Sequence, residues 1–310
     1  MKGARRALTG VLLLDKHVGL SSNTAVGWSK RLFNAEKAGH TGTLDPFATG
    51  LLPICFGEAA KFARFMLDAE KAYQATLRLG QTSSTGDTEG EITDTGVVDV
   101  DLAKVSAALA KFIGPQTQIP PMHSALKQGG VPLYKLARQG IEVDRPPRDI
   151  VIASLNAVAL NGDALIIDTV VSKGTYIRVL AEDIGEALGC GAYLTGLRRT
   201  MTGGFAVARA VTLEALESMS MEAREAALLP ADSLAMALRA IRLDARFARE
   251  LQDGKNPRIE AMLTDGEILR AYDHAGRFLG VATASACAEN RATLTALRLM
   301  APIDPHAEIH

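Results

Sequence analysis

Hydrophobic and polar residues alternate along several segments of this chain, as they do in a strand with one buried face. The clearest case is 71–79, where Tyr73, Ala75, Leu77 and Leu79 share one face. Short unbroken hydrophobic runs are typical of more deeply buried strands, and the Asn161-Gly162 dipeptide predicts a hairpin turn. The strands predicted in this way cover 11–14, 51–56, 71–79, 150–160 and 164–171.

Hydrophobic residues at intervals of three and four predict helices between these strands. One runs to Phe33 from a serine cap at Ser21 or Ser22, and another follows Thr175 and ends at Gly189. Their predicted inward residues are Ala25, Trp28 and Leu32 in the first, and Ile177, Leu180, Ala181, Ile184 and Leu188 in the second. Further helices are predicted over 59–67, 102–112, 134–138 and, with a break at Pro230, 213–241.

The order of these elements predicts an α+β fold with a mixed, mainly antiparallel sheet flanked by helices, because hairpin signals outnumber strand–helix–strand alternation. An acidic stretch rich in Thr, Ser and Gly, about 81–100, reads as an exposed loop or loose hairpin inserted in this part. From about residue 242, short β-like runs alternate with turns, which predicts a compact all-β module of about 60 residues. We therefore predict one domain over 1–240 and a second over 241–310.

Composition limits the class of protein. Hydrophobic residues make up 47% and charged residues 22%, as in ordinary soluble globular proteins. The hydrophobic runs are too short to span a bilayer or to form a signal-peptide core, so we expect a cytoplasmic protein. The three cysteines are far apart and the six histidines lack metal-ligand spacing, which argues against a disulfide framework or a metal site.

Charge is distributed unevenly although the net charge is only −1. Residues 1–80 hold 11 Lys or Arg against 6 Asp or Glu, whereas residues 81–110 hold 1 Lys against 6 acids. The segment 190–209 carries Arg198, Arg199 and Arg209 and no acid. A basic face able to bind a polyanion can therefore form on a neutral protein, although a mixed surface of ordinary kind is the alternative.

The most informative segment is 39–50, which reads Gly-His-Thr-Gly-Thr-Leu-Asp-Pro-Phe-Ala-Thr-Gly. Its glycines allow a close backbone approach to a ligand, and Pro46 fixes the backbone directly after Asp45. The segment thus displays a single carboxylate on a stiff polar turn, an arrangement suited to chemistry. The competing interpretation is a turn in which Asp45 only bonds neighbouring amides.

Four separated motifs point to a family. They are Asp15-Lys16-His17-Val18-Gly19-Leu20-Ser21-Ser22, the Asp45 segment, Lys71-Ala72-Tyr73, and Ser172-Lys173-Gly174-Thr175-Tyr176-Ile177-Arg178, with Leu197-Arg198-Arg199 soon after. Their order and spacing closely resemble the TruB family, the bacterial tRNA pseudouridine-55 synthases. The resemblance covers most of 10–210 and includes Gln118-Ile119-Pro120-Pro121-Met122 and Ser124-Ala125-Leu126-Lys127. The C-terminal segment looks like the PUA-like RNA-binding module of that family.

The resemblance implies isomerisation of one uridine in the tRNA T loop to pseudouridine, with Asp45 as the catalytic carboxylate. Family routes have this acid attack ribose C1′ or uracil C6, or remove a ribose proton. A hydrolytic glycosidase normally needs two flanking carboxylates, whereas the Asp45 loop offers one acid. Isomerisation needs no metal, redox agent or energy donor, and the sequence lacks a Rossmann or Walker glycine pattern, so no cofactor is expected.

The same resemblance assigns substrate-binding roles to His40, Tyr73, Tyr176, Arg178 and Leu197. Arg178 would pair with Asp45 and keep it ionised, although Glu182 at i+4 offers an alternative partner. Tyr73 and His40 would contact the everted base, although core packing and a loop hydrogen bond are the respective alternatives. Tyr176 and Leu197 would line the uridine pocket or serve packing alone.

Lys16, Arg198 and Arg199 are the candidates for contacts to the RNA backbone, with solvated surface as the alternative. Two positions depart from the family pattern. His17 replaces a common proline, and His123 replaces a common tyrosine or phenylalanine. The expected partner is the T arm of tRNA, with no membrane, no obligatory protein partner and a monomeric state. Two rival functions remain, an RNA-binding chaperone for tRNA folding and a guide-RNA-dependent synthase. A nucleotide-binding loop is disfavoured because no lysine follows the glycines as in a P-loop.

Overall fold

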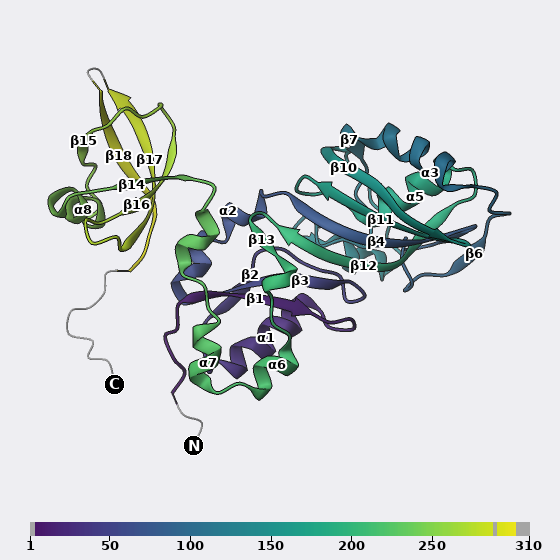
Figure 1. The fold of residues 1–310 in the computed structure, drawn as a ribbon, viewed down its shortest axis with the longest axis horizontal. Coiled ribbons are helices and arrows are strands. Elements are labelled where there is room, and N and C mark those ends of the chain that lie inside the picture. The colour runs from purple at the N-terminus through teal and green to yellow at the C-terminus, as the bar shows by residue number, and fades with distance from the viewer. Residues whose placement is uncertain (1–3, 288–289, 302–310) are drawn as a thin grey trace.

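A nine-stranded mixed sheet forms the larger part of the molecule (Figure 1). The computed structural model describes residues 4–287 and 290–301. The strands of this sheet are β1 (Gly10–Lys16), β2 (Ala38–His40), β3 (Thr49–Phe56), β4 (Lys71–Leu79), β7 (Gly114–Gln118), β10 (Arg148–Asn161), β11 (Ala164–Val171), β12 (Ala192–Thr202) and β13 (Phe205–Ala206). Their order is β1-β3-β12-β4-β11-β10-β7, with β2 beside β3 and β13 beside β12. The pairs are antiparallel except β12 with β3, so the predicted sheet is confirmed.

Helices cover the main-core face of this sheet. They are α1 (Ser22–Leu32), α3 (Leu102–Leu109), α5 (Ile177–Ala187) and α6 (Leu213–Ser218), whereas α4 (Leu133–Ala137) and α7 (Met221–Ala226) contribute no buried residue to the main core. The main core joins Leu12, Leu77 and Ile167 of the strands to Ala25 of α1 and Ile184 of α5. Burial at every second residue of β4, including Tyr73, follows the alternation in the sequence.

A second hydrophobic cluster covers the opposite face of β1 and β3. It packs Val11 and Leu51 against the 3₁₀ turns η1 (Gly57–Phe62) and η4 (Ala231–Ala235) and against α2 (Arg64–Leu67). The continuous helix predicted over 59–67 is therefore wrong, because the chain forms η1 and a single α turn there. The predicted helical segment 213–241 is likewise broken into α6, α7 and η4, and Trp28 of α1 is exposed rather than inward. The remaining short turns are η2 (Ala110–Phe112) and η3 (Val207–Arg209).

The C-terminal part is a curled five-stranded sheet, as expected for a PUA-like module (Figure 1). It contains β14 (Arg239–Arg242), β15 (Arg258–Glu260), β16 (Ile268–Tyr272), β17 (Phe278–Cys287) and β18 (Arg291–Leu299). The all-β prediction is wrong in one respect, because α8 (Ala245–Gln252) also packs on this sheet. Asp244 caps α8 by accepting a hydrogen bond from Phe247 N, and Ala248 and Leu251 are buried.

Several contacts attach the C-terminal sheet to the larger part, among them a hydrogen bond from Tyr272 Oη to Asp232 Oδ2 at 2.7 Å. Val281 is fully buried in the second hydrophobic cluster, and Phe278 packs on Phe62 with ring centroids 5.1 Å apart. Lys61 Nζ donates to Leu299 O at 3.2 Å. These contacts fix the C-terminal sheet on the side of η1, away from the face of β4 that carries Tyr73.

Two small hairpins lie outside both sheets. β5 (Gln81–Ser83) pairs with β6 (Ile92–Asp94), and β8 (Lys127–Gln128) pairs with β9 (Val131–Pro132) before α4. The first confirms a hairpin in the acidic segment. The segment is not wholly exposed, however, because Asp87 between β5 and β6 is 2% exposed.

Candidate active site

The loop that carries Asp45 connects β2 to β3 at the place where β3 meets β12. Only Arg198–Thr49 and Arg199–Gly50 are paired in this parallel contact. Gly50 has φ +97°, and a Cβ there would lie 2.3 Å from Arg199 O. Glycine is required at this position because the two backbones pass too closely for a side chain. This close contact between β3 and β12 sets where the Asp45 loop leaves the sheet.

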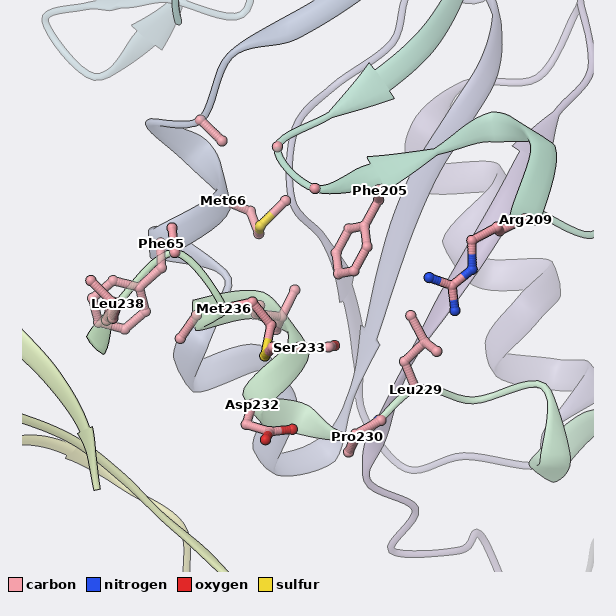
Figure 2. A pocket seen from close by; sticks show the side chains of 16 residues that line it. Phe65, Met66, Phe205, Arg209, Leu229, Pro230, Asp232, Ser233, Met236 and Leu238 are labelled. Carbon is pink, nitrogen blue, oxygen red and sulfur yellow. The ribbon is translucent and has the colours of Figure 1, made fainter. Parts of the chain in front are cut away.

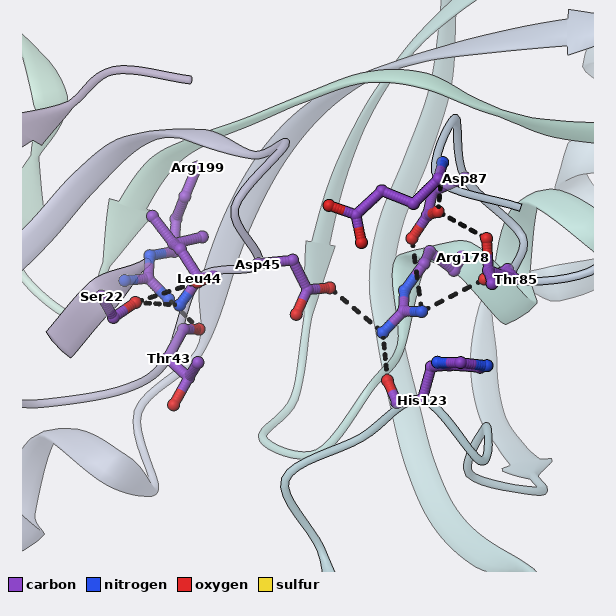
Figure 3. A network of polar contacts seen from close by, with 10 residues as sticks. Ser22, Thr43, Leu44, Asp45, Thr85, Asp87, His123, Arg178 and Arg199 are labelled. Atoms are coloured by element: carbon purple, nitrogen blue, oxygen red, sulfur yellow. Dashed lines mark hydrogen bonds and ion pairs between the residues drawn. The ribbon is translucent and has the colours of Figure 1, made fainter. Parts of the chain in front are cut away.

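Buried side chains hold this loop from behind. Arg199 is 1% exposed and donates from Nε to Leu51 O at 2.7 Å and from its terminal nitrogens to Gly42 O and Thr43 O at 3.2 and 3.3 Å. Ser22 Oγ, in the first turn of α1, accepts from Leu44 N at 2.8 Å and donates to Leu44 O at 2.9 Å. These bonds hold the loop at Leu44, the residue just before Asp45 (Figure 3).

Lys16 holds the other end of the loop. Its Nζ donates to Leu20 O at 2.8 Å, His17 O at 3.1 Å and Pro46 O at 3.4 Å, and the side chain is fully buried. Burial lowers the Lys16 pKa to about 8, against the attraction of Asp45. Both Lys16 and Arg199 are enclosed and bonded to the loop, so neither presents its charge at the surface of this structure, and their contacts with RNA phosphates stay predictions. Arg198 pairs with Asp15 and its side chain is 41% exposed, so a contact of Arg198 with RNA stays a prediction.

Replacing Arg199 with methionine should destabilise the fold by about 2 kcal/mol, because it leaves buried carbonyls of the Asp45 loop without donors. Arg198 is the matched control: it pairs with Asp15 at 2.6 and 3.0 Å nearer the surface, and Arg198→Met should cost less than about 1 kcal/mol. Urea unfolding of the two variants measures the difference. Equal losses of unfolding free energy in the two variants would contradict the proposed role of Arg199 in holding the loop.

Arg178, in the first turn of α5, connects Asp45 to two other segments (Figure 3). Its Nη2 lies 3.1 Å from Asp45 Oδ2 and donates to His123 O at 2.7 Å. Its Nη1 lies 3.3 Å from Asp87 Oδ2 and donates to Thr85 O at 3.1 Å. The Arg178 side chain is 6% exposed. Arg178 thus pairs with Asp45 as predicted, and with Asp87 rather than with Glu182.

Asp87, Thr85 and His123 belong to this network although no pattern in the sequence predicts it. Asp87 comes from the acidic segment expected to be exposed, and its Oδ1 also accepts from Thr85 Oγ1 at 2.6 Å and Glu89 N at 3.0 Å. His123 contributes its backbone carbonyl. The departure from an aromatic residue at position 123 therefore leaves the bond to Arg178 intact.

Neighbouring groups and burial shift the pKa of Asp45 in opposite directions. Burial raises the pKa of Asp45 and is the largest effect, and the Asp87 carboxylate raises it further. The Arg178 guanidinium and the Lys16 ammonium lower it, but the net pKa lies above the ordinary aspartate value. Because 40% of the Asp45 side chain is exposed, the carboxylate is reachable from the cavity side while its back is held by Arg178.

Asp87→Asn should move the acidic limb of the pH–rate profile to lower pH for any reaction that requires ionised Asp45. Neutralising Asp87 removes a charge that raises the Asp45 pKa, so Asp45 stays ionised to a lower pH. Single-turnover rates from about pH 4 to 8, each normalised to its plateau, test this. Glu89→Gln, an exposed acid in the same loop, should leave the limb in place. An upward shift for Asp87→Asn would contradict the electrostatic assignment.

A cavity of about 430 Å³ opens beside Asp45, within the range of small-molecule sites. Its lining includes Asp45, Tyr73, Ser124, Tyr176, Arg178 and Leu197. The structure therefore brings together Asp45 and four of the five predicted substrate-binding residues. Tyr73 is 9% exposed and belongs to both core and cavity wall, so the two interpretations of Tyr73 are compatible.

His40 is the predicted binding residue that does not line this cavity. Its Nδ1 accepts a hydrogen bond from Gly42 N at 3.2 Å, and burial together with Arg199 lowers its pKa. The structure thus has the loop hydrogen bond that was the alternative for His40. A contact of His40 with the base stays a prediction.

A larger cavity of about 780 Å³ lies between α2, β13 and η4 (Figure 2). Met66 and Phe205 form part of its hydrophobic lining, and Arg209 and Asp232 are among its few charged groups. It shares no lining residue with the Asp45 cavity. The paired acid and arginine line the smaller cavity.

Among residues 4–287 and 290–301, no three His, Cys, Asp or Glu side chains are grouped as metal ligands. No helix there is long and hydrophobic enough to cross a membrane.

Comparison with known proteins agrees with this geometry. Residues 30–177 match the N-terminal domain of TruB family pseudouridylate synthase, and residues 178–239 match the tRNA pseudouridylate synthase B C-terminal domain. The tRNA pseudouridine synthase B of Burkholderia mallei (strain NCTC 10247) is 51% identical over 287 residues, which cover 91% of this chain and 95% of that protein. That of Neisseria gonorrhoeae (strain ATCC 700825 / FA 1090) is 50% identical over 281 residues, which cover 91% and 92%.

Solved structures show the same fold. The matched chain of a Cbf5–Nop10–Gar1 complex has a TM-score of 0.74 and 25% identity, over 94% of this chain and 85% of that one. The matched chain of the archaeal box H/ACA sRNP Nop10–Cbf5 complex has a TM-score of 0.71 and 25% identity, over 94% and 86%. The mixed sheet, the cavity and these similarities define a pseudouridine synthase, an isomerase. Within that class the chain belongs to the TruB family.

Proposed function

We propose that this enzyme converts the uridine at position 55 in the T loop of tRNA to pseudouridine, with Asp45 as the catalytic carboxylate. The observation that carries the proposal is the Asp45–Arg178 pair at the wall of a nucleoside-sized cavity beside Tyr73, Tyr176 and Leu197. The relatives that are about half identical over most of their length are named tRNA pseudouridine synthases, which supports tRNA as the substrate.

The base must leave the T-loop stack before Asp45 can reach it. In the cavity, Tyr73 offers a ring face for the everted uracil and Leu197 a hydrophobic wall. Arg178 holds the Asp45 carboxylate toward the glycosidic bond. The C1′–N1 bond breaks, the base turns and a C1′–C5 bond forms. The proton lost from C5 is balanced by one gained at N1, so no external reagent is consumed.

Other parts of the chain support recognition of the RNA. Arg198 lies on the surface near the loop and is a candidate phosphate contact. We assign the catalytic domain to 1–240 and an RNA-binding role to the PUA-like module at 241–310, whose curled sheet carries several arginines. We further propose that the enzyme works as a cytoplasmic monomer without an obligatory protein partner. The identity to stand-alone tRNA synthases favours this over the guide-RNA-dependent alternative.

A tritium-release or mass-shift assay on T-arm RNA with the purified chain tests the proposal. We expect pseudouridine at the target position without added protein, guide RNA or cofactor. A dependence on a guide RNA and partner proteins would favour the rival synthase class. Failure to modify T-arm RNA or tRNA under any of these conditions would reject the assignment.

A further inference from the structure

A buried glutamine holds the backbone at one wall of the Asp45 cavity. Gln118 Oε1 accepts a hydrogen bond from Tyr176 N at 2.9 Å, and Gln118 Nε2 donates to Tyr176 O at 3.1 Å. Tyr176 lines the cavity, whereas Gln118 is 5% exposed and lies behind the lining. One side chain from the edge strand β7 thus binds both backbone polar groups of a cavity residue 58 positions away in the chain.

This contact fixes the beginning of α5. Tyr176 is the N-cap residue of α5, but its side chain makes no capping hydrogen bond. The hydroxyl of the preceding Thr175 donates to Ser172 O at 3.1 Å. Tyr176 O accepts from Leu180 N in the first helical turn as well as from Gln118. The first turn of α5 is therefore held from a distant strand, where many helices are held by a cap in their own sequence.

Gln118 also stands at the start of a loop that lines the same cavity. It is the last residue of β7, and residues 124–126 of the following loop belong to the cavity lining. A second bond joins this loop to α5, from Arg178 Nη2 to His123 O at 2.7 Å. The loop and the first turn of α5 are thus attached at two places. A shift of Tyr176 relative to the loop would change the shape of the cavity.

We propose that Gln118 is a positioning residue for pseudouridine formation, which holds Tyr176 so that its ring contacts the everted uracil. This inference rests on the proposed function and gives a role to the Gln118-Ile119-Pro120-Pro121-Met122 motif. Gln118 acts through Tyr176, because Gln118 itself does not line the cavity. Without the amide, Tyr176 N and Tyr176 O lose a partner each, and the backbone before α5 is free to shift. A small displacement of a group that orients the substrate slows the chemical step.

Gln118→Met tests the proposal, because it keeps the length of the side chain and removes both hydrogen bonds. We expect the single-turnover rate on T-arm RNA to fall about tenfold. Gln116→Met on the same strand is the matched control and should leave the rate unchanged, since the Gln116 amide donates to Lys111 O outside the cavity. Circular dichroism at the assay temperature checks that both variants are folded. If Gln118→Met does not fold, Gln118→Glu replaces it, which keeps an acceptor for Tyr176 N and removes the amide donor to Tyr176 O.

Combining the Gln118 variant with Tyr176→Leu separates positioning from a purely structural role. In the Tyr176→Leu background, the Gln118 substitution should lower the rate by less than about twofold, because the ring that Gln118 positions is already absent. Equal losses in the two backgrounds, or an unchanged rate in the single Gln118 variant, would overturn the inference.

RNA binding gives a second readout. The Gln118 variant should bind T-arm RNA with a uridine at the target position more weakly than the unchanged enzyme does. Its affinity for the same RNA with an abasic ribose there should be unchanged, because the Tyr176 ring then has no base to contact. Equal losses of affinity for the two RNAs would contradict a role through the base. If the unchanged enzyme makes no pseudouridine, the proposed function itself fails.

Discussion

Asp45→Asn should lower the rate of pseudouridine formation by at least about a thousandfold, because an amide can act neither as a nucleophile nor as a base. RNA affinity should change by less than about threefold, because asparagine keeps the shape and one acceptor oxygen toward Arg178. The fold should not lose stability, since burial disfavours the charge that the substitution removes. Single-turnover rates, RNA-binding constants and urea unfolding measure the three effects.

Asp68→Asn is the control for the loss of a carboxylate elsewhere. Asp68 pairs with Lys173 at 2.6 Å, and its side chain is 70% exposed, so the rate should stay close to that of the unchanged enzyme. Full activity in Asp45→Asn would end the assignment of Asp45. Asp45→Asn also tests the chaperone alternative. If Asp45→Asn and the unchanged enzyme promote tRNA folding equally, but only the unchanged enzyme modifies tRNA, the protein has a second activity that is separate from the chemistry.

Arg178→Met should destabilise the protein by about 3–5 kcal/mol, because it leaves a buried carboxylate without its counter-ion. Asp87 is 2% exposed and 3.3 Å from the guanidinium. Asp45 loses the same partner, and three segments of the chain lose their common donor. Urea unfolding measures the loss, and single-turnover rates should fall in parallel because Asp45 is no longer oriented.

The double variant Arg178→Met with Asp87→Asn separates the two effects. Removing the buried charge should recover a large part of the stability and little of the rate. Lys173→Met, which breaks the exposed pair with Asp68, should cost less than about 1 kcal/mol. If Arg178→Met were as stable as Lys173→Met, Asp87 would not depend on Arg178, and the proposed network would be wrong.

Local patterns predicted most strands and several helices correctly. The hairpin at Asn161-Gly162, the strand at 71–79 and the helix ended by Gly189 all follow from residues within a few positions of each other. Helical spacing failed at 59–67, where packing against η4 favours a 3₁₀ turn and one α turn over a regular helix. It also failed at Trp28, because Ser22, Ala25 and Ser29 form the buried face of α1.

The sequence by itself determined the strand pattern and the family, and it singled out Asp45, the acid that we propose as the catalytic carboxylate, because each of these depends on residues close together in the chain. Only the tertiary structure decided what surrounds that acid. Asp87 and Thr85 come from the acidic segment predicted to be exposed, His123 comes from a separate loop, and all three meet at Arg178 in the first turn of α5. Lys16 and Arg199 resemble phosphate ligands in the sequence, but the parallel contact of β3 with β12 encloses Arg199, and the fold of the Asp45 loop encloses Lys16. Burial and long-range contact are properties of the whole fold, so no local pattern reports them.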